Sequence, residues 1–145
     1  MKRKYMIIVF LLIIAIIGFV IYIQIPEMKP IYNIKKIANT NFNNPLFLKS
    51  MTWGITYDSK VIVLSTNDEE EFIPDSTKDY VYKGASFLFY RFSNDSLLLY
   101  VADKTHIPEL FNSQIKIKQI ELDNPAMMNL KGNSAFVRQG LTEFN

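Results

Sequence analysis

The sequence predicts a single transmembrane helix at the N-terminus, followed by a mainly β domain that is antiparallel, sandwich-like or α+β, with short helices. Three observations predict this class. Residues 6–25 form an uncharged apolar run, apolar residues alternate with polar ones from Met51, and several short apolar segments farther along are separated by turn residues.

The apolar run directly follows the basic residues of the N-terminus. At 1.5 Å per residue, a helix over residues 6–25 reaches about 30 Å, the thickness of a hydrocarbon core. A cleaved secretory signal is the alternative, but no small-x-small cleavage site follows the run, and a lipoprotein signal would need a cysteine. We therefore expect an uncleaved anchor that contacts the lipid bilayer through residues 6–25.

The charges that flank the anchor predict its orientation. Lys2, Arg3 and Lys4 are contiguous beside the first apolar residue, whereas the lysines that follow the run are spread out. The positive-inside rule then makes residues 1–5 a basic cytoplasmic tail. We expect a single-pass protein of the cell membrane whose C-terminal domain is periplasmic or extracellular.

The net charge of +2 belongs to the anchor rather than to the domain. Without Lys2, Arg3 and Lys4, 13 basic residues face 14 acidic ones, a formal net charge of −1. No block rich in Lys or Arg remains, which argues against a nucleic-acid partner. The absence of cysteine excludes disulfides and thiolate metal sites, and it favours a bacterial envelope protein over a eukaryotic secreted one.

Residues 26–50 are predicted to be a connector between the anchor and the domain. Within it, Ile31, Ile34 and Ile37 recur every third residue, which predicts a short amphipathic helix after Pro30.

The β-rich extracytoplasmic domain is predicted over residues 51–145. Residues 67–78 are polar and contain a proline, so they are predicted to be a long loop. Strands are predicted over residues 51–57, 60–66, 79–83, 86–92, 96–102 and 113–122. The first two form a hairpin through Asp58-Ser59, and two of the later segments are apolar on both faces, as in covered central strands.

The last predicted strand has two further features. Its alternation slips by one residue at Gln119, which predicts a β-bulge. Lys116 and Lys118 predict an edge or solvent-facing strand, because charge on an edge blocks unwanted pairing.

The C-terminal tail is predicted to be helical and to cover one face of the sheet. Asp123-Asn124-Pro125 is a helix start, and Ser134 is expected to cap a second helical turn that ends at Gly140. The residues expected to face the sheet are Met127, Met128, Phe136 and Leu141.

Two features are candidates for contact with a partner. Asp68, Glu69, Glu70 and Glu71 form the densest charge run, and they lack the spacing and the glycine of a calcium loop. A solvated loop is the plain alternative, and a basic partner patch is the specific one. Trp53 belongs to an aromatic-rich set of strand residues that either pack in the sheet or anchor an interface.

The sequence lacks the usual constellations of an enzyme. His106 is the only histidine and is expected to lie on the surface, and no nucleophile elbow, phosphate-binding loop or zinc-protease motif is present. We therefore expect no catalytic residues, no metal and no cofactor.

These features lead to one expectation and two alternatives. The expectation is a membrane-anchored bacterial envelope protein whose small β-rich domain is a binding or assembly module for a protein partner in the envelope. The alternatives are an immunity or inhibitor protein against an envelope-acting toxin, and a hydrolase that uses a pair of carboxylates.

Overall fold

The computed structural model describes residues 2–24, 29–37, 45–54, 56 and 58–145. The chain begins with helix α1, Lys2–Gln24, whose apolar side chains from Met6 to Val20 are about half exposed or more wherever they are described. Within the described part of the chain, no helix combines the length and the hydropathy needed to cross a membrane.

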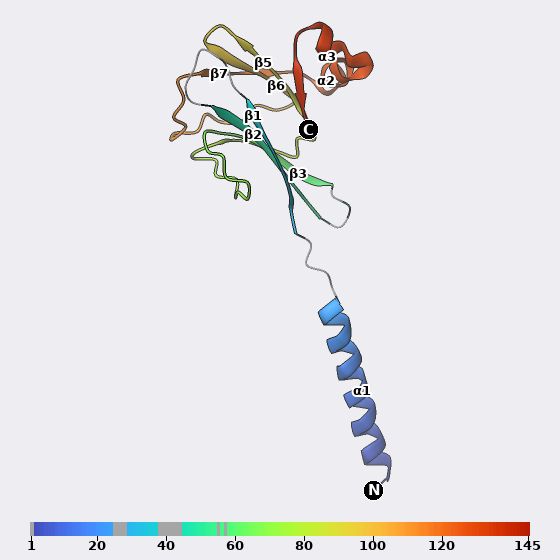
Figure 1. The fold of residues 1–145 in the computed structure, drawn as a ribbon. Helices are drawn as coiled ribbons and strands as arrows, with labels where there is room; N and C mark the ends of the chain where they lie inside the picture. Colours follow the sequence, from blue (N-terminus) through green and yellow to red (C-terminus); the bar gives the residue numbers. More distant parts are fainter. Residues whose placement is uncertain (1, 25–28, 38–44, 55, 57) are drawn as a thin grey trace.

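The rest of the chain forms two four-stranded sheets that face each other (Figure 1). Sheet A has the order β1-β2-β3-β4 and consists of Ile31–Ile37, Leu46–Trp53, Ser59–Ser65 and Tyr80–Lys83. Sheet B has the order β7-β6-β5-β8 and consists, in that order, of Lys116–Glu121, Ser96–Val101, Leu88–Ser93 and Thr142–Phe144. The prediction of a mainly β domain with short helices is confirmed.

The core lies between the two sheets because each strand turns alternate side chains inward. From sheet A, Leu48, Ile62 and Leu64 are fully buried, and from sheet B, Leu97 and Leu99 are fully buried against them.

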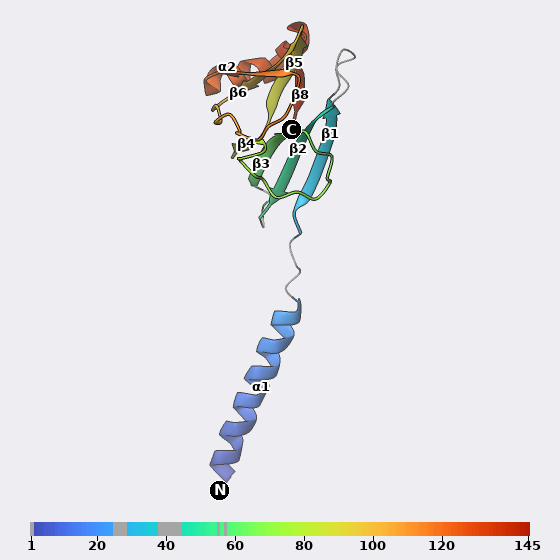
Figure 2. The same ribbon diagram turned by 90° about the vertical axis from the view of Figure 1, so that its left-hand side faces the viewer.

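The outer faces of the two sheets are covered differently (Figure 2). Helix α2, Asn124–Lys131, and the short helix α3, Ala135–Arg138, lie over sheet B, where Met127 and Leu130 pack on Phe89. No described helix covers the outer face of sheet A. Of the segments that the structure describes, the loop between β3 and β4 alone crosses it, with Phe72 packed on Val61, Val63 and Val81.

The predicted helix after Pro30 is wrong, because residues 31–37 form strand β1. It pairs with β2 in an antiparallel register, so residues 31–50 contribute two strands to sheet A. Isoleucine favours strands through its branched Cβ, and Ile37 enters the core while Ile31 stays exposed. The spacing of three therefore does not mark a buried helical face.

The predicted hairpin and the predicted long loop are confirmed, whereas the β-bulge is wrong. The hairpin connection differs from the predicted Asp58-Ser59 turn, because Ser59 already belongs to β3 and pairs with Trp53. The connection is residues 54–58, of which 55 and 57 lie outside the described residues. β7 is an edge strand, as predicted, but it pairs with β6 in parallel and without an inserted residue. Gln119 is half-buried because its amide bonds within the protein, and this interrupts the apolar alternation.

The C-terminal tail follows the prediction in part. Asp123 caps α2 by accepting a hydrogen bond from the Ala126 N–H at 2.8 Å. Ser134 precedes α3 but makes no side-chain capping bond, and Met128 is 53% exposed instead of covering the sheet. Met127 and Leu141 are buried as expected, and Phe136 stacks on Phe89.

Candidate functional site on the outer face of sheet A

A lysine occupies the middle of the outer face of sheet A. Lys49 lies on β2 opposite Val63 of β3, and its side chain shares this face with Met51 and Trp53. Only 1% of Lys49 is exposed, although lysine is seldom fully buried without partners.

The partners of Lys49 come from the loop that crosses this face. Its Nζ donates hydrogen bonds to Asn67 Oδ1 at 2.7 Å and to the Glu69 carbonyl oxygen at 3.0 Å, and it lies 5.3 Å from the centre of the Phe72 ring. Burial lowers the pKa of Lys49, while the charges of Asp79, Glu69 and Asp68 oppose that shift. Lys49 therefore holds the beginning of the loop against the sheet.

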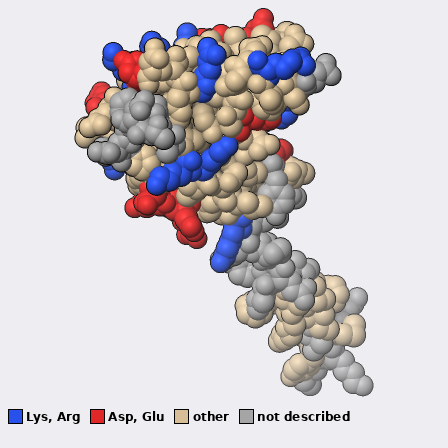
Figure 3. Space-filling model, turned by 45° about the horizontal axis from the view of Figure 1, so that its top comes forward, with Lys and Arg blue, Asp and Glu red and all other residues tan. Residues whose placement is uncertain are grey.

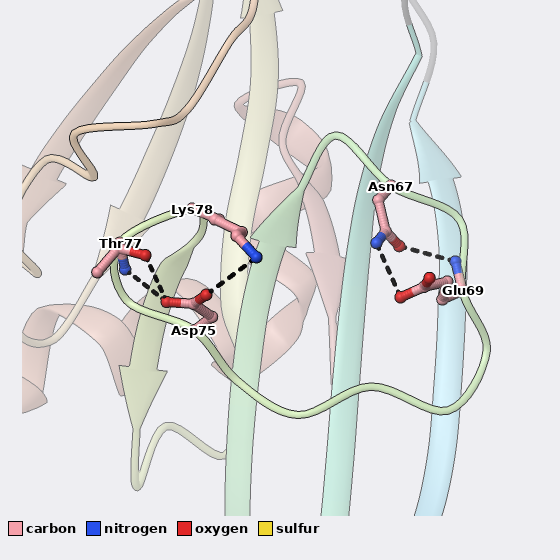
Figure 4. A network of polar contacts seen from close by, with 5 residues as sticks. All are labelled: Asn67, Glu69, Asp75, Thr77 and Lys78. Carbon is pink, nitrogen blue, oxygen red and sulfur yellow. Dashed lines mark hydrogen bonds and ion pairs between the residues drawn. The ribbon is translucent and has the colours of Figure 1, made fainter.

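The two ends of the loop are further organised by short polar contacts (Figure 4). Asn67 Oδ1 accepts a bond from the Glu69 N–H at 2.8 Å, and its Nδ2 donates to Glu69 Oε2 at 2.9 Å. At the other end, Asp75 Oδ1 accepts bonds from the N–H and hydroxyl of Thr77, and Asp75 Oδ2 lies 3.5 Å from Lys78 Nζ. These contacts lower the pKa of Asp75, chiefly through the Thr77 hydroxyl. The loop thus has a fixed conformation at both ends.

Asp79 lies where the loop joins β4, close to Lys49. Burial raises the pKa of Asp79, although a hydrogen bond from Ser65 and the charge of Lys49 favour its ionised form. A partly buried carboxylate and a buried ammonium group therefore share one side of the loop.

Two cavities open beside the loop, and Pro74 lines both. The first has a volume of about 640 Å³, with a mixed charged and apolar lining that includes Lys49, Glu69, Glu71, Ile73 and Asp79. The second has a volume of about 450 Å³ and a mainly apolar lining that includes Trp53 and Val61.

The structure brings the sequence-predicted contact residues to the same side of sheet A. Asp68, Glu69, Glu70 and Glu71 are exposed on the loop, and Trp53 is 39% exposed at the end of β2. Glu69 bonds within the loop, but among the described residues no ion pair involves Asp68, Glu70 or Glu71. Figure 3 shows a group of acidic side chains along the lower left of the domain. The predicted contact of residues 68–71 and Trp53 with a partner stays a prediction.

His106 is exposed, as predicted, and its Nε2 lies 2.8 Å from the Ser76 carbonyl oxygen. That oxygen can only accept, so Nε2 carries the proton. Over the described ranges, no three His, Asp or Glu side chains converge as metal ligands would. The outer face of sheet A therefore combines two cavities with exposed acidic side chains, apolar side chains and a buried lysine.

Sequence reasoning missed Lys49 and Gln119. Lys49 falls between Leu48 and Ser50 in a segment predicted to be a connector, so nothing marked it as buried. Gln119 left a signal in the broken alternation of β7. Its Oε1 accepts bonds from the Tyr82 hydroxyl at 3.1 Å and the Thr105 N–H at 2.9 Å, and its Nε2 donates to the Thr105 carbonyl oxygen at 2.8 Å.

Comparison of the chain with protein-family models, with curated proteins and with solved structures finds no match in any of the three.

Proposed function

We propose that this chain is a membrane-anchored protein of the bacterial envelope and that its β domain binds a protein partner through the outer face of sheet A. The observation that carries the proposal is the difference between the two outer faces. Helices cover sheet B, whereas sheet A carries a loop with an exposed acidic run and with Ile73 at 90% exposure. Exposed apolar side chains rimmed by polar ones are typical of interaction sites.

The anchor is supported by the sequence of residues 6–25 and by the surroundings of α1. The run contains no charged residue, and the described apolar side chains of α1 find no protein surface to bury them. Leaving so many apolar side chains in water is unfavourable, and lipid would remove that cost. The basic residues before the run favour a cytoplasmic N-terminus.

The partner surface is expected to be basic. Among the described residues, no lysine or arginine lies within ion-pair distance of Asp68, Glu70 or Glu71. Complementary charge on a partner would raise the association rate and select against acidic surfaces. The fixed ends of the loop reduce the conformational entropy lost on binding.

Membrane topology can be tested with single cysteines, because the chain has none of its own. Glu70→Cys and Lys2→Cys variants are exposed to a membrane-impermeant maleimide in intact cells. In intact cells we expect labelling of the Glu70→Cys variant and none of the Lys2→Cys variant. After lysis we expect labelling of both. Labelling of the Lys2 variant in intact cells would contradict the orientation, and recovery of the protein in the soluble fraction would contradict the anchor.

Binding can be tested with a photo-crosslinking amino acid placed at Glu71 in cells that express the chain at its native level. The matched control carries the same group at Met128, which is exposed on α2 over the other sheet. We expect discrete protein adducts from position 71 and none from position 128. No adducts at all, or the same adducts from both positions, would contradict binding through sheet A.

A further inference from the structure

We propose that the end of sheet A at which β1 begins rests on the lipid headgroups, with Trp53 and Ile31 at the bilayer surface and Lys29 and Lys83 facing anionic lipid. The inference rests on the proposed anchor. It assigns Trp53, a predicted partner contact, to lipid and leaves the acidic loop to the protein partner.

The strand register brings these residues to one end of the sheet. Ile31 pairs with Thr52, Trp53 pairs with Ser59, and Val61 pairs with Lys83. The start of β1, the end of β2, the start of β3 and the end of β4 therefore lie at the same end of sheet A. Figure 2 shows the start of β1 on the side of the domain that faces α1.

The chain length keeps this end close to the membrane. Only residues 26–30 separate the apolar run from Ile31. Six residue steps span at most roughly 20 Å even when fully extended. The start of β1 therefore stays within a short distance of the bilayer surface, whatever path the connecting residues take.

The chemistry of this end suits the headgroup layer. Ile31 is 56% exposed and Trp53 is 39% exposed beside the apolar cavity of about 450 Å³. Tryptophan prefers the membrane–water interface, where its apolar ring and its polar N–H are both accommodated. Apolar side chains at this position would exchange water for the upper acyl region.

Among the described residues at this end, the lysines outnumber the carboxylates, since Lys60 lies here as well as Asp58. Lys29 and Lys83 are exposed, and neither forms an ion pair with another described residue. Lysines close to an anionic surface bind it electrostatically. The loop begins beside Lys49, four residues from Trp53 along β2 or roughly 13 Å away, and then approaches this end, because Phe72 packs on Tyr32 and Val61.

Trp53 is the only tryptophan of the chain, so its fluorescence reports on this end alone. The full chain is reconstituted in phosphatidylcholine vesicles with and without phosphatidylglycerol, and acyl chains brominated near the headgroup serve as quenchers. Both leaflets carry the quencher, so the fluorescence of Trp53 can be quenched in either orientation of the protein. We expect bromine quenching and protection from aqueous iodide, both stronger when phosphatidylglycerol is present.

Variants separate the apolar and the electrostatic contributions. Ile31→Ser is expected to lose most of the bromine quenching, whereas Ile107→Ser, at an exposed isoleucine elsewhere, keeps it. The double variant Lys29→Gln/Lys83→Gln is expected to lose the dependence on phosphatidylglycerol, whereas Lys118→Gln on β7 retains it.

Two results would overturn the proposal and are distinguishable. If the chain withstands an alkaline wash of the vesicles while Trp53 stays open to iodide and unquenched by bromine, the anchor holds and the lipid contact is wrong. If the wash removes the chain, the anchor itself is wrong and the lipid contact fails with it.

Discussion

Lys49 illustrates at the scale of one residue how a buried charge can fix a surface loop. Its ammonium group is removed from water and in exchange bonds to Asn67 and to the Glu69 carbonyl. A buried charge that loses its partners costs far more than an exposed one, so the position of the loop and the charge of Lys49 depend on each other.

The first prediction is that Lys49→Met destabilises the domain by about 1–3 kcal/mol, because the Glu69 carbonyl oxygen loses the Lys49 donor and Asn67 Oδ1 keeps only the bond from the Glu69 N–H. Urea denaturation of the full chain in detergent micelles, followed by circular dichroism, measures the free energy of unfolding. The control is Lys118→Met on the exposed side of β7, expected to change it by less than about 0.5 kcal/mol. Equal effects of the two substitutions would contradict the role of Lys49.

Asp79 and Asp95 are predicted to give opposite pH dependences. Burial raises the pKa of Asp79 in the folded state, so its stabilising contribution is full below the unfolded pKa and is lost as the pH rises through the folded pKa. The Lys116 bond, 3.1 Å long, lowers the pKa of Asp95, so its contribution is present above the unfolded pKa and lost as the pH falls through the folded value.

The measurement compares each variant with the wild type between about pH 3 and pH 7, a range that spans ordinary carboxyl pKa values. The free energy of unfolding of Asp79→Asn, relative to wild type, is expected to rise with pH across this range. That of Asp95→Asn is expected to fall. Differences of the same sign would show that Asp79 is not held in a desolvated site.

Gln119 shows what a residue pattern can and cannot predict. The interruption of the alternation in β7 is visible in the sequence, but its cause is a set of bonds to Tyr82 and Thr105, which lie far away along the chain. A local pattern cannot distinguish a polar residue bonded between two sheets from a bulge, because both break the period of two. The acidic run was predictable as an exposed loop, and Trp53 as a strand residue that either packs in the sheet or anchors an interface, whereas the burial of Lys49 was not predictable.

At the scale of elements, the predictable strands are those with local signals. The β2–β3 hairpin has alternation and a turn, and α2 has Asp123 and Pro125 at its start. Strand β8, Thr142–Phe144, is too short to show a period. Parallel strands need a crossover connection, which is usually a helix. The crossover to β7, residues 102–115, forms no helix, so nothing in its sequence indicates that β7 pairs in parallel with β6.

Strand β1 is the longest edge strand of the two sheets, and its lysines are predicted to keep it unpaired. Asn33 bonds to the Asn145 carbonyl oxygen at 3.2 Å, and Lys35 points toward sheet B with its Nζ 5.4 Å from the centre of the Tyr90 ring. A charge directed inward at an edge discourages a second chain from adding a strand. Lys35→Val is therefore expected to cause concentration-dependent self-association.

Analytical ultracentrifugation in detergent micelles detects that association. The control, Arg91→Val, removes one positive charge from β5, which already has a partner strand on each side. It is expected to leave the chain as dispersed as the wild type. Association of both variants would indicate a general effect of charge, and association of neither would contradict the protective role of Lys35.

At the scale of the whole molecule, the proposed anchor and its short connection to β1 would determine which surfaces a partner can reach. In the proposed topology, this tether would hold the start of β1 near the bilayer. The two proposed contacts, lipid at Trp53 and protein at the acidic loop, use different residues of one face, and Pro74 of the loop lines the cavities beside both.

The tether itself gives the last prediction. A flexible Gly/Ser insertion of about 12 residues between Met28 and Lys29 adds roughly 20 Å of root-mean-square reach. Because effective concentration falls steeply with tether length, most of the bromine quenching of Trp53 should be lost while the chain still withstands the alkaline wash. The control carries the same insertion after Asn145 and should keep the quenching. Undiminished quenching with the lengthened tether would mean that the domain binds lipid by its own affinity, and would contradict a contact maintained by the short connection.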